Sequence, residues 1–229
     1  MKSASPLFML AVLFCPPGAH AEGPAKTLYA CAFNAGGWNR ADWTRVGNPG
    51  MDFGDFVQEE GRIANTVPPG ATHKELRGKL AAKTFASMVY RERIAGDVAA
   101  TATMDFADET APLIVLAENL TQNADGQKQL GERFEVVIYD KGVNIWRHDT
   151  KDGKLICRLA VFARFPLEKN TRYALEVKKI GKTLTVSVAG HTFGCTDDAL
   201  PDSFYVGITG CEGLNHFYDF ALRPASGKP

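Results

Sequence analysis

The sequence predicts an all-β protein, a two-sheet antiparallel β-sandwich with little helix. Apolar and polar residues alternate with a period of two over 98–106, and short Gly-containing turns separate apolar segments through the second half of the chain. Helical periodicity is weak throughout. Together these features indicate about a dozen short strands at the spacing typical of sandwiches.

The first 21 residues have the features of a secretory signal peptide. Lys2 supplies the positive charge, residues 6–15 are apolar, and a small-x-small cleavage motif ends at Ala21. The apolar stretch is shorter than the about 20 residues of a membrane span. We therefore expect export to the periplasm or the extracellular space, one sandwich domain over 22–223 and a flexible tail over 224–229.

The first half of the domain shows few strand signals. Residues 27–33 are expected to form the first strand, followed by a Gly/Asn-rich loop that holds Trp38 and Trp43. Residues 48–74 are expected to be irregular because Asn-Pro-Gly and Pro-Pro-Gly sequences punctuate them. Residues 74–84 suit either a helix or a solvated strand.

The second half reads as one strand after another. Residues 113–116 are continuously apolar, residues 119–131 form a polar loop, and tight Gly-containing turns at 140–142, 181–182 and 189–190 connect hairpins. The expected strands are 98–106, 113–116, 134–139, 143–146, 155–165, 173–180, 183–188 with a third meander strand after it, 206–209 and 217–222. In the last of these Tyr218, Phe220 and Leu222 alternate, which predicts that all three belong to the core.

Composition and cysteines narrow the class of protein. The chain has 26 basic and 26 acidic residues and no basic cluster, so neither nucleic acid nor membrane insertion is expected, whereas a saccharide or polysaccharide suits the balance. Four cysteines follow residue 21, and an even number in an exported protein indicates disulfides. We favour Cys31–Cys211 with Cys157–Cys195, because the first and last strands of sandwiches lie together. Free buried thiols are the alternative in a reducing compartment.

The order of segments resembles a known superfamily. Phe33 to Trp43, then 60–63 (Glu-Gly-Arg-Ile), the hairpin of 173–190 and the closing strands from Phe204 onward resemble the concanavalin A-like lectin/glucanase superfamily. Within it, the chain is most similar to exported bacterial domains grouped with 3-keto-disaccharide hydrolases. The resemblance covers most of 22–223 and implies a jelly roll more than an activity.

The paired acids of the superfamily's glucanases are missing. Those enzymes carry Glu-x-Asp-x-Glu or Glu-x-Asp-x-x-Glu on one strand, and neither spacing occurs in this chain, where Asp105, Asp108 and Glu109 come closest. A retaining glycosidase needs two carboxylates about 5 Å apart. The predicted function is therefore saccharide binding without turnover. The alternatives are a hydrolase or lyase acting on glycosides or keto sugars, and a structural or adhesive module of the envelope.

Two segments supply the candidate ligand-binding residues. On a strand, the side chains of Asn144, Trp146 and His148 share one face, where Trp would stack on a sugar ring while Asn and His bind hydroxyls. Alternatively, Trp146 caps the edge of the core and His148 begins a turn. The second segment is a Gly-bounded loop with Glu212, which either contacts ligand or ties down the loop.

Further candidates lie in and near the same loop. Asn215 and His216 complete the ligand-binding set, and Glu212 and His148 are the catalytic candidates if the protein is an enzyme. The two tryptophans of the 34–43 loop form either a binding platform or packing on the first strand. No metal site or cofactor is expected: Asp219 is a conceivable calcium ligand, but no Asp-rich loop supplies the about six oxygens that calcium needs.

Overall fold

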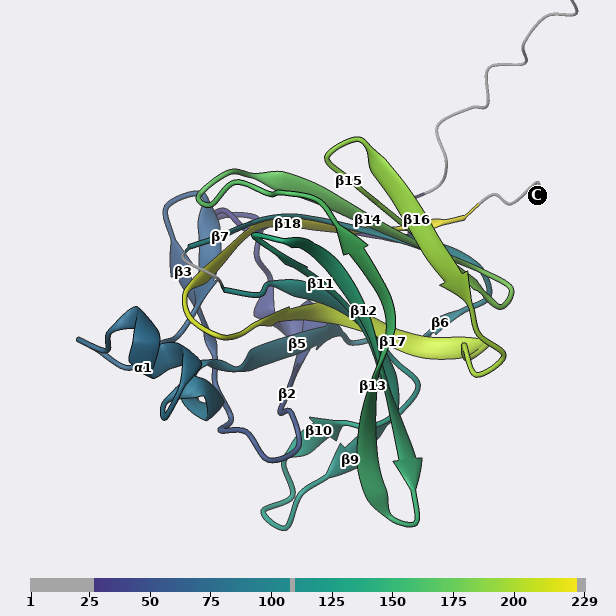
Figure 1. The fold of residues 1–229 in the computed structure, drawn as a ribbon, viewed down its shortest axis with the longest axis horizontal. Helices are drawn as coiled ribbons and strands as arrows, with labels where there is room; N and C mark the ends of the chain where they lie inside the picture. Colours follow the sequence, from purple (N-terminus) through teal and green to yellow (C-terminus); the bar gives the residue numbers. More distant parts are fainter. Residues whose placement is uncertain (1–26, 108–109, 226–229) are drawn as a thin grey trace, which may run out of the picture.

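The computed structural model describes residues 27–107 and 110–225 and confirms the two-sheet antiparallel sandwich (Figure 1). The predicted signal peptide at 1–21 and residues 226–229 of the predicted tail lie outside the described residues. No helix in the described part of the chain is long and apolar enough to cross a membrane.

Sheet A contains eight strands in the order β16-β15-β14-β7-β18-β4-β3, with β1 also paired to β18. Its strands are β1 (Tyr29–Ala32), β3 (Phe56–Glu59), β4 (Arg62–Asn65), β7 (Val98–Phe106), β14 (Tyr173–Ile180), β15 (Thr183–Val188), β16 (His191–Thr196) and β18 (Asn215–Pro224). The meander predicted over 173–188 and beyond is confirmed as β14 to β16.

Sheet B also contains eight strands, in the order β13-β12-β11-β8-β17-β5-β2, with β6 paired to β17. Its strands are β2 (Trp43–Val46), β5 (Ala86–Tyr90), β6 (Ile94–Ala95), β8 (Leu113–Ala117), β11 (Arg133–Tyr139), β12 (Gly142–Lys151), β13 (Lys154–Arg164) and β17 (Ser203–Gly210). A separate hairpin joins β9 (Leu120–Gln122) to β10 (Lys128–Leu130). Short helices are η1 (Arg40–Asp42), α1 (His73–Arg77) and η2 (Ala81–Thr84).

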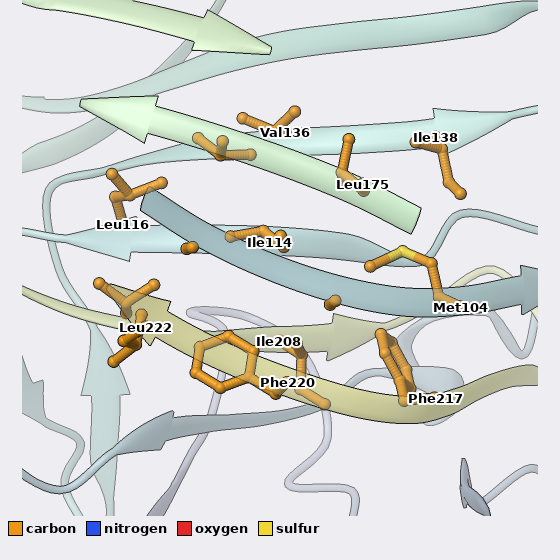
Figure 2. Packing of buried hydrophobic residues seen from close by; sticks show 14 of the residues in the cluster. Met104, Ile114, Leu116, Val136, Ile138, Leu175, Ile208, Phe217, Phe220 and Leu222 are labelled. Atoms are coloured by element: carbon orange, nitrogen blue, oxygen red, sulfur yellow. The ribbon is translucent and has the colours of Figure 1, made fainter. Parts of the chain in front are cut away.

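The main core fills the space between the two sheets (Figure 2). Met104 from β7 and Phe217 from β18 meet Ile114 and Val136 from sheet B, all fully buried. The continuous apolar run of β8 has a specific cause, because both faces of the strand are covered. Ile114 faces the main core, whereas Leu113 joins a second apolar cluster on the outer face of sheet B.

Some segments expected to be irregular contain strands. The hairpin β3–β4 lies within 48–74, and β9–β10 lies within the polar loop 119–131. Strand β4 pairs with β18, so a partner distant in sequence stabilises residues whose local pattern is weak. The ambiguous 74–84 segment overlaps α1 and η2, and a capping box between Thr72 and Glu75 begins α1.

The expected alternation of the last strand is interrupted. The register with β7 shifts between Phe217 and Asp219, so Tyr218 is an extra residue on β18. This bulge turns Tyr218 outward, where its hydroxyl donates a hydrogen bond to Asp105. Phe217 enters the core instead, together with Phe220 and Leu222. The prediction that Tyr218 is a core residue was therefore wrong.

The predicted disulfides are not formed, and Cys31, Cys157, Cys195 and Cys211 are free. First and last strands do pair, but the register partner of Cys31 is Phe220. Cys31 lies in the core between the sheets, whereas Cys211 belongs to the cluster on the outer face of sheet B. Sheet B therefore separates the two thiols.

Candidate functional site

A cavity of about 270 Å³ opens on the outer face of sheet B, and we refer to it as the outer cavity. Three parts of the chain surround it: the β11–β12 hairpin, the segments at 111–113 and 211–212, and the region from α1 to Phe85. The lining residues are Arg77, Phe85, Ala111, Leu113, Glu135, Val137, Tyr139, Asp140, Lys141, Asn144, Trp146, Cys211 and Glu212.

The register of the β11–β12 hairpin brings the polar lining together. Glu135 lies opposite Trp146, and Val137 lies opposite Asn144. Because successive side chains point to opposite faces of a strand, Ile145 enters the main core while its neighbours Asn144 and Trp146 face the cavity. Trp146 is half-buried against the outer apolar cluster, which fixes its ring at the cavity wall.

A strained turn presents Glu212. Its φ is +58°, a left-handed conformation that costs most L-residues about 1–2 kcal/mol. The backbone N–H of Glu212 donates to Thr84 Oγ1 at 2.8 Å. At Gly213, where φ is +133°, a Cβ atom would lie 2.5 Å from Thr110 Cγ2, so this position requires glycine. The turn is fixed on both sides, and the exposed Glu212 carboxylate lines the cavity.

The carboxylates of the cavity differ in their surroundings. Glu135 accepts hydrogen bonds from Arg133 Nε at 2.6 Å and pairs with His148 Nε2 at 3.1 Å. Burial raises the pKa of Glu135, but these two partners outweigh it and lower the pKa to about 2. By contrast, the carboxylates of Asp140 and Glu212 form no hydrogen bond or ion pair within 27–107 and 110–225. Both residues line the outer cavity.

Neutral groups complete the wall. Burial raises the pKa of the Tyr139 phenol, and the neighbouring Asn144 partly opposes this rise. Burial also raises the pKa of Cys211 well above its ordinary value, so its thiol stays protonated and donates to the Ala111 carbonyl at 3.0 Å. The site therefore combines a phenol, an amide, an indole, carboxylates and the cationic Arg77 and Lys141 around an apolar floor.

The structure brings three of the six predicted ligand-binding residues to this cavity: Asn144, Trp146 and Glu212. His148 lies behind Glu135 and lines a separate cavity of about 220 Å³. Asn215 is fully buried, and its Nδ2 donates to the carbonyls of Cys211 at 2.9 Å and Gly213 at 3.1 Å. It thereby shapes the turn that holds Glu212.

His216 lies on sheet A. Its Nδ1 pairs with Asp105 Oδ1 at 2.6 Å. Burial raises the pKa of Asp105, but the hydrogen bonds from His216 and Tyr218 outweigh it and lower that pKa. This buried pair does not line the outer cavity.

Sequence reasoning missed Glu135, Tyr139, Asp140 and Lys141. A signal for them existed: Glu135 and Tyr139 share one face of a strand whose turn at 140–142 places it beside Asn144 and Trp146. Arg77 and Phe85 had no such signal, because α1 and the residues after it reach the cavity through the fold alone.

The two tryptophans of the 34–43 loop lie at a different place. Trp43 is 8% exposed and packs on Phe220 with ring centroids 5.1 Å apart. The guanidinium of Arg40 lies over the ring of Trp38, 4.4 Å from the ring centre. Together they line a separate cavity of about 240 Å³.

Metal ligands are not clustered in the described residues. No group of three or more His, Cys, Asp or Glu side chains there is placed to hold a metal ion. The side chain of Asp219 accepts a hydrogen bond from the Thr103 N–H at 3.0 Å, which links the bulged strand β18 to β7.

Comparison with known proteins identifies the fold. No family model and no curated protein matches the chain. Among solved structures, it is similar to a protein of unknown function with a galectin-like fold from Bacillus subtilis (TM-score 0.59, 11% identity, covering 90% of this chain and 100% of that chain). It is also similar to the CBM2 module of the evolved Dit protein of Lactobacillus casei BL23 phage J-1 (0.56, 13%, 90% and 98%). A third is the carbohydrate-binding module CBM66 from Bacillus subtilis (0.54, 10%, 80% and 95%). At these identities the similarity shows a shared jelly-roll fold.

Proposed function

We propose that this protein is an exported saccharide-binding domain whose site is the outer cavity. The observation that carries the proposal is the convergence of Asn144, Trp146 and Glu212 on one cavity from segments far apart in the sequence. An indole stacks on the apolar face of a sugar ring, and amide and carboxylate groups bind its hydroxyls. At about 270 Å³, the cavity is near the lower end of the about 300–1,000 Å³ of small-molecule sites, a size that suits a single sugar unit.

The backbone of Glu212 supports this assignment. A residue other than Gly, Asn or Asp at positive φ is uncommon, and such strain concentrates at functional sites. Asn or Gly would adopt the positive φ of this turn with less backbone strain. A glutamate whose carboxylate faces the cavity, with no hydrogen bond or ion pair to residues 27–107 and 110–225, is instead suited to ligand binding.

The names of two similar structures, both carbohydrate-binding modules, agree with saccharide binding. A structural or adhesive module would suit a flat outer sheet, whereas this sheet carries a cavity. The predicted signal peptide supports export, and the N-terminal sequence of the mature protein tests it: a mature chain that retains residues 1–21 would contradict export.

Turnover of glycosides or keto sugars, as the resemblance to 3-keto-disaccharide hydrolases implies, is the second candidate. It draws on the presence of both Glu135 and Glu212 in the cavity. A general acid must be protonated at the working pH, and a pKa of about 2 keeps Glu135 ionised. His148 is bonded to Glu135 and lines another cavity. We therefore infer binding without turnover. If the protein hydrolysed a glycoside and Glu212→Gln abolished that activity, this inference would have to be replaced by an enzymatic function.

Binding is tested by glycan-array screening of the purified protein, followed by calorimetric titration of the best saccharide. We expect Trp146→Ala to weaken binding by about tenfold or more, since loss of a central tryptophan anchor from a binding site costs about 2 kcal/mol. Trp38→Ala is the matched control, because it removes the same kind of side chain from the separate cavity that Trp38 and Trp43 line. Binding that survives Trp146→Ala but is lost with Trp38→Ala would move the site to that cavity.

A further inference from the structure

Strand β13 is an exposed edge of sheet B. It pairs with β12 on one side and ends the strand order of the sheet on the other. Four of the seven exposed large apolar side chains in the described residues lie on this strand: Leu155 (39% exposed), Ile156 (41%), Leu159 (46%) and Phe162 (47%). An edge strand presents unpaired N–H and C=O groups to any further strand. Apolar side chains concentrated on such an edge mark an interaction surface.

The regular part of this edge is short and has a defined centre. Ile145 of β12 pairs with Val161 and Trp146 pairs with Leu159, so Ala160 is an extra residue that interrupts the edge. The segment from Leu155 to Leu159, which precedes this extra residue and is bounded by two exposed leucines, has Cys157 at its midpoint. Figure 1 shows the β12–β13 hairpin reaching beyond the body of the sheets at the bottom of the view.

We propose that β13 pairs antiparallel with β13 of a second copy of this chain, about a twofold axis at Cys157. In this register Leu155 lies opposite Leu159 of the second copy, an apolar pair that occurs twice by symmetry. Cys157 lies opposite its own equivalent.

Charge favours this register over one centred on Leu159. A twofold axis at Leu159 would place Lys154 opposite Arg164, and like charges directly opposite one another destabilise a strand pair. The axis at Cys157 places Lys154 opposite Ala160 and Arg158 opposite Ile156. Arg158 also keeps its own partner, since its Nε lies 3.4 Å from Asp149 Oδ2 within the same chain.

The pairing goes beyond the proposed function and has a geometric consequence. Side-by-side antiparallel strands are related by an axis perpendicular to their common sheet, so both outer cavities would open on the same side. Trp146 lies one strand from the edge, which places the two cavities near the junction. A saccharide with repeated units could then occupy both sites.

Sedimentation velocity of the reduced protein over a wide range of concentrations tests the dimer. We expect a monomer–dimer equilibrium, and Leu159→Asp should raise its dissociation constant by about tenfold or more. Val57→Asp is the matched control, because Val57 is 43% exposed and lies on β3, the edge strand of sheet A. A monomer at every concentration, or a dimer disrupted by Val57→Asp but not by Leu159→Asp, would overturn the proposal.

Thiol trapping locates the axis. With oxidised glutathione, the two Cys157 thiols would reduce the glutathione disulfide and form one intersubunit disulfide, which releases two molecules of reduced glutathione. Residues directly opposite in antiparallel strands have Cα atoms about 4.5–5.5 Å apart, within the range for a disulfide. We expect a covalent dimer that Cys157→Ser abolishes and Leu159→Asp slows. A covalent dimer that persists in Cys157→Ser would contradict this register.

Discussion

Replacement of Glu212 by asparagine should make the protein more stable and its outer cavity a weaker binding site. Glu212 has a φ of +58°, where the Cβ atom of an L-residue approaches the following carbonyl oxygen at a cost of about 1–2 kcal/mol. Asparagine enters this region more readily because its short side chain forms local hydrogen bonds. The same substitution removes a carboxylate from the cavity.

The structure indicates how much of this strain a substitution recovers. The Glu212 N–H is bonded to Thr84, and Gly213 is confined by Thr110, so the turn keeps its conformation in a variant. If asparagine recovers about half of the cost, the free energy of unfolding rises by roughly 0.5–1 kcal/mol. For a domain of this size that corresponds to a rise in Tm of about 1–4 °C. Glycine relieves the same strain but loses about 0.4–1 kcal/mol through its more flexible unfolded chain, so Glu212→Gly should lie closer to the parent protein.

Glu212→Gln separates the effect of backbone strain from the effect of charge. Glutamine has the same length as glutamate and keeps the backbone strain at this position, but it lacks the negative charge. Thermal unfolding followed by circular dichroism should show an unchanged Tm for Glu212→Gln and a raised Tm for Glu212→Asn. Calorimetric titration with the bound saccharide should show weaker binding for both. A Tm of Glu212→Asn at or below the parent value would refute the strain argument, and undiminished affinity would remove Glu212 from the site.

Three further substitutions test other parts of the structure. Because the pKa of Glu135 falls to about 2 in the folded protein, the ionised carboxylate should stabilise the fold above about pH 4.5 by on the order of 3 kcal/mol, and this contribution should be lost as the pH falls toward 2. Urea unfolding across this range should show a shallower pH dependence of stability for Glu135→Gln than for the parent protein, and equal slopes would contradict the prediction. Asn65→Ala removes a buried amide that donates to the Gly213 carbonyl at 2.8 Å, so it should lower the free energy of unfolding by about 2–3 kcal/mol and weaken saccharide binding by loosening the Glu212 turn. A free energy of unfolding within about 0.5 kcal/mol of the parent value would show that the turn does not depend on Asn65. Gly207→Ala would place a Cβ atom 2.0 Å from the Met88 carbonyl oxygen and should lower the free energy of unfolding by at least about 1–3 kcal/mol. An unchanged midpoint in urea unfolding would show that β17 can shift away from β5.

The sequence predicted elements whose partners are close along the chain. The β11–β12 hairpin follows from alternation and a Gly-containing turn, and these also predict that Asn144 and Trp146 share a face. Strand β4 could not be found in this way, because its pairing with β18 joins residues about 150 positions apart. The placement of His148 depended on Glu135, whose role becomes visible only when Arg133 and His148 are seen to bind the same carboxylate.

The β11–β12 hairpin has a consequence for how binding preference can diversify. The twelve residues from Glu135 to Trp146 supply seven of the thirteen residues that line the outer cavity. Their inward-facing neighbours, such as Val136 and Ile145, belong to the main core, whereas Asp140 and Lys141 belong to the turn between the two strands. Substitutions at the turn residues Asp140 and Lys141 can change the charge presented to a ligand without touching the core. Under the proposed function, a small, contiguous part of the gene would therefore control which saccharide the cavity accepts, and this hairpin would be the target for directed evolution of that choice.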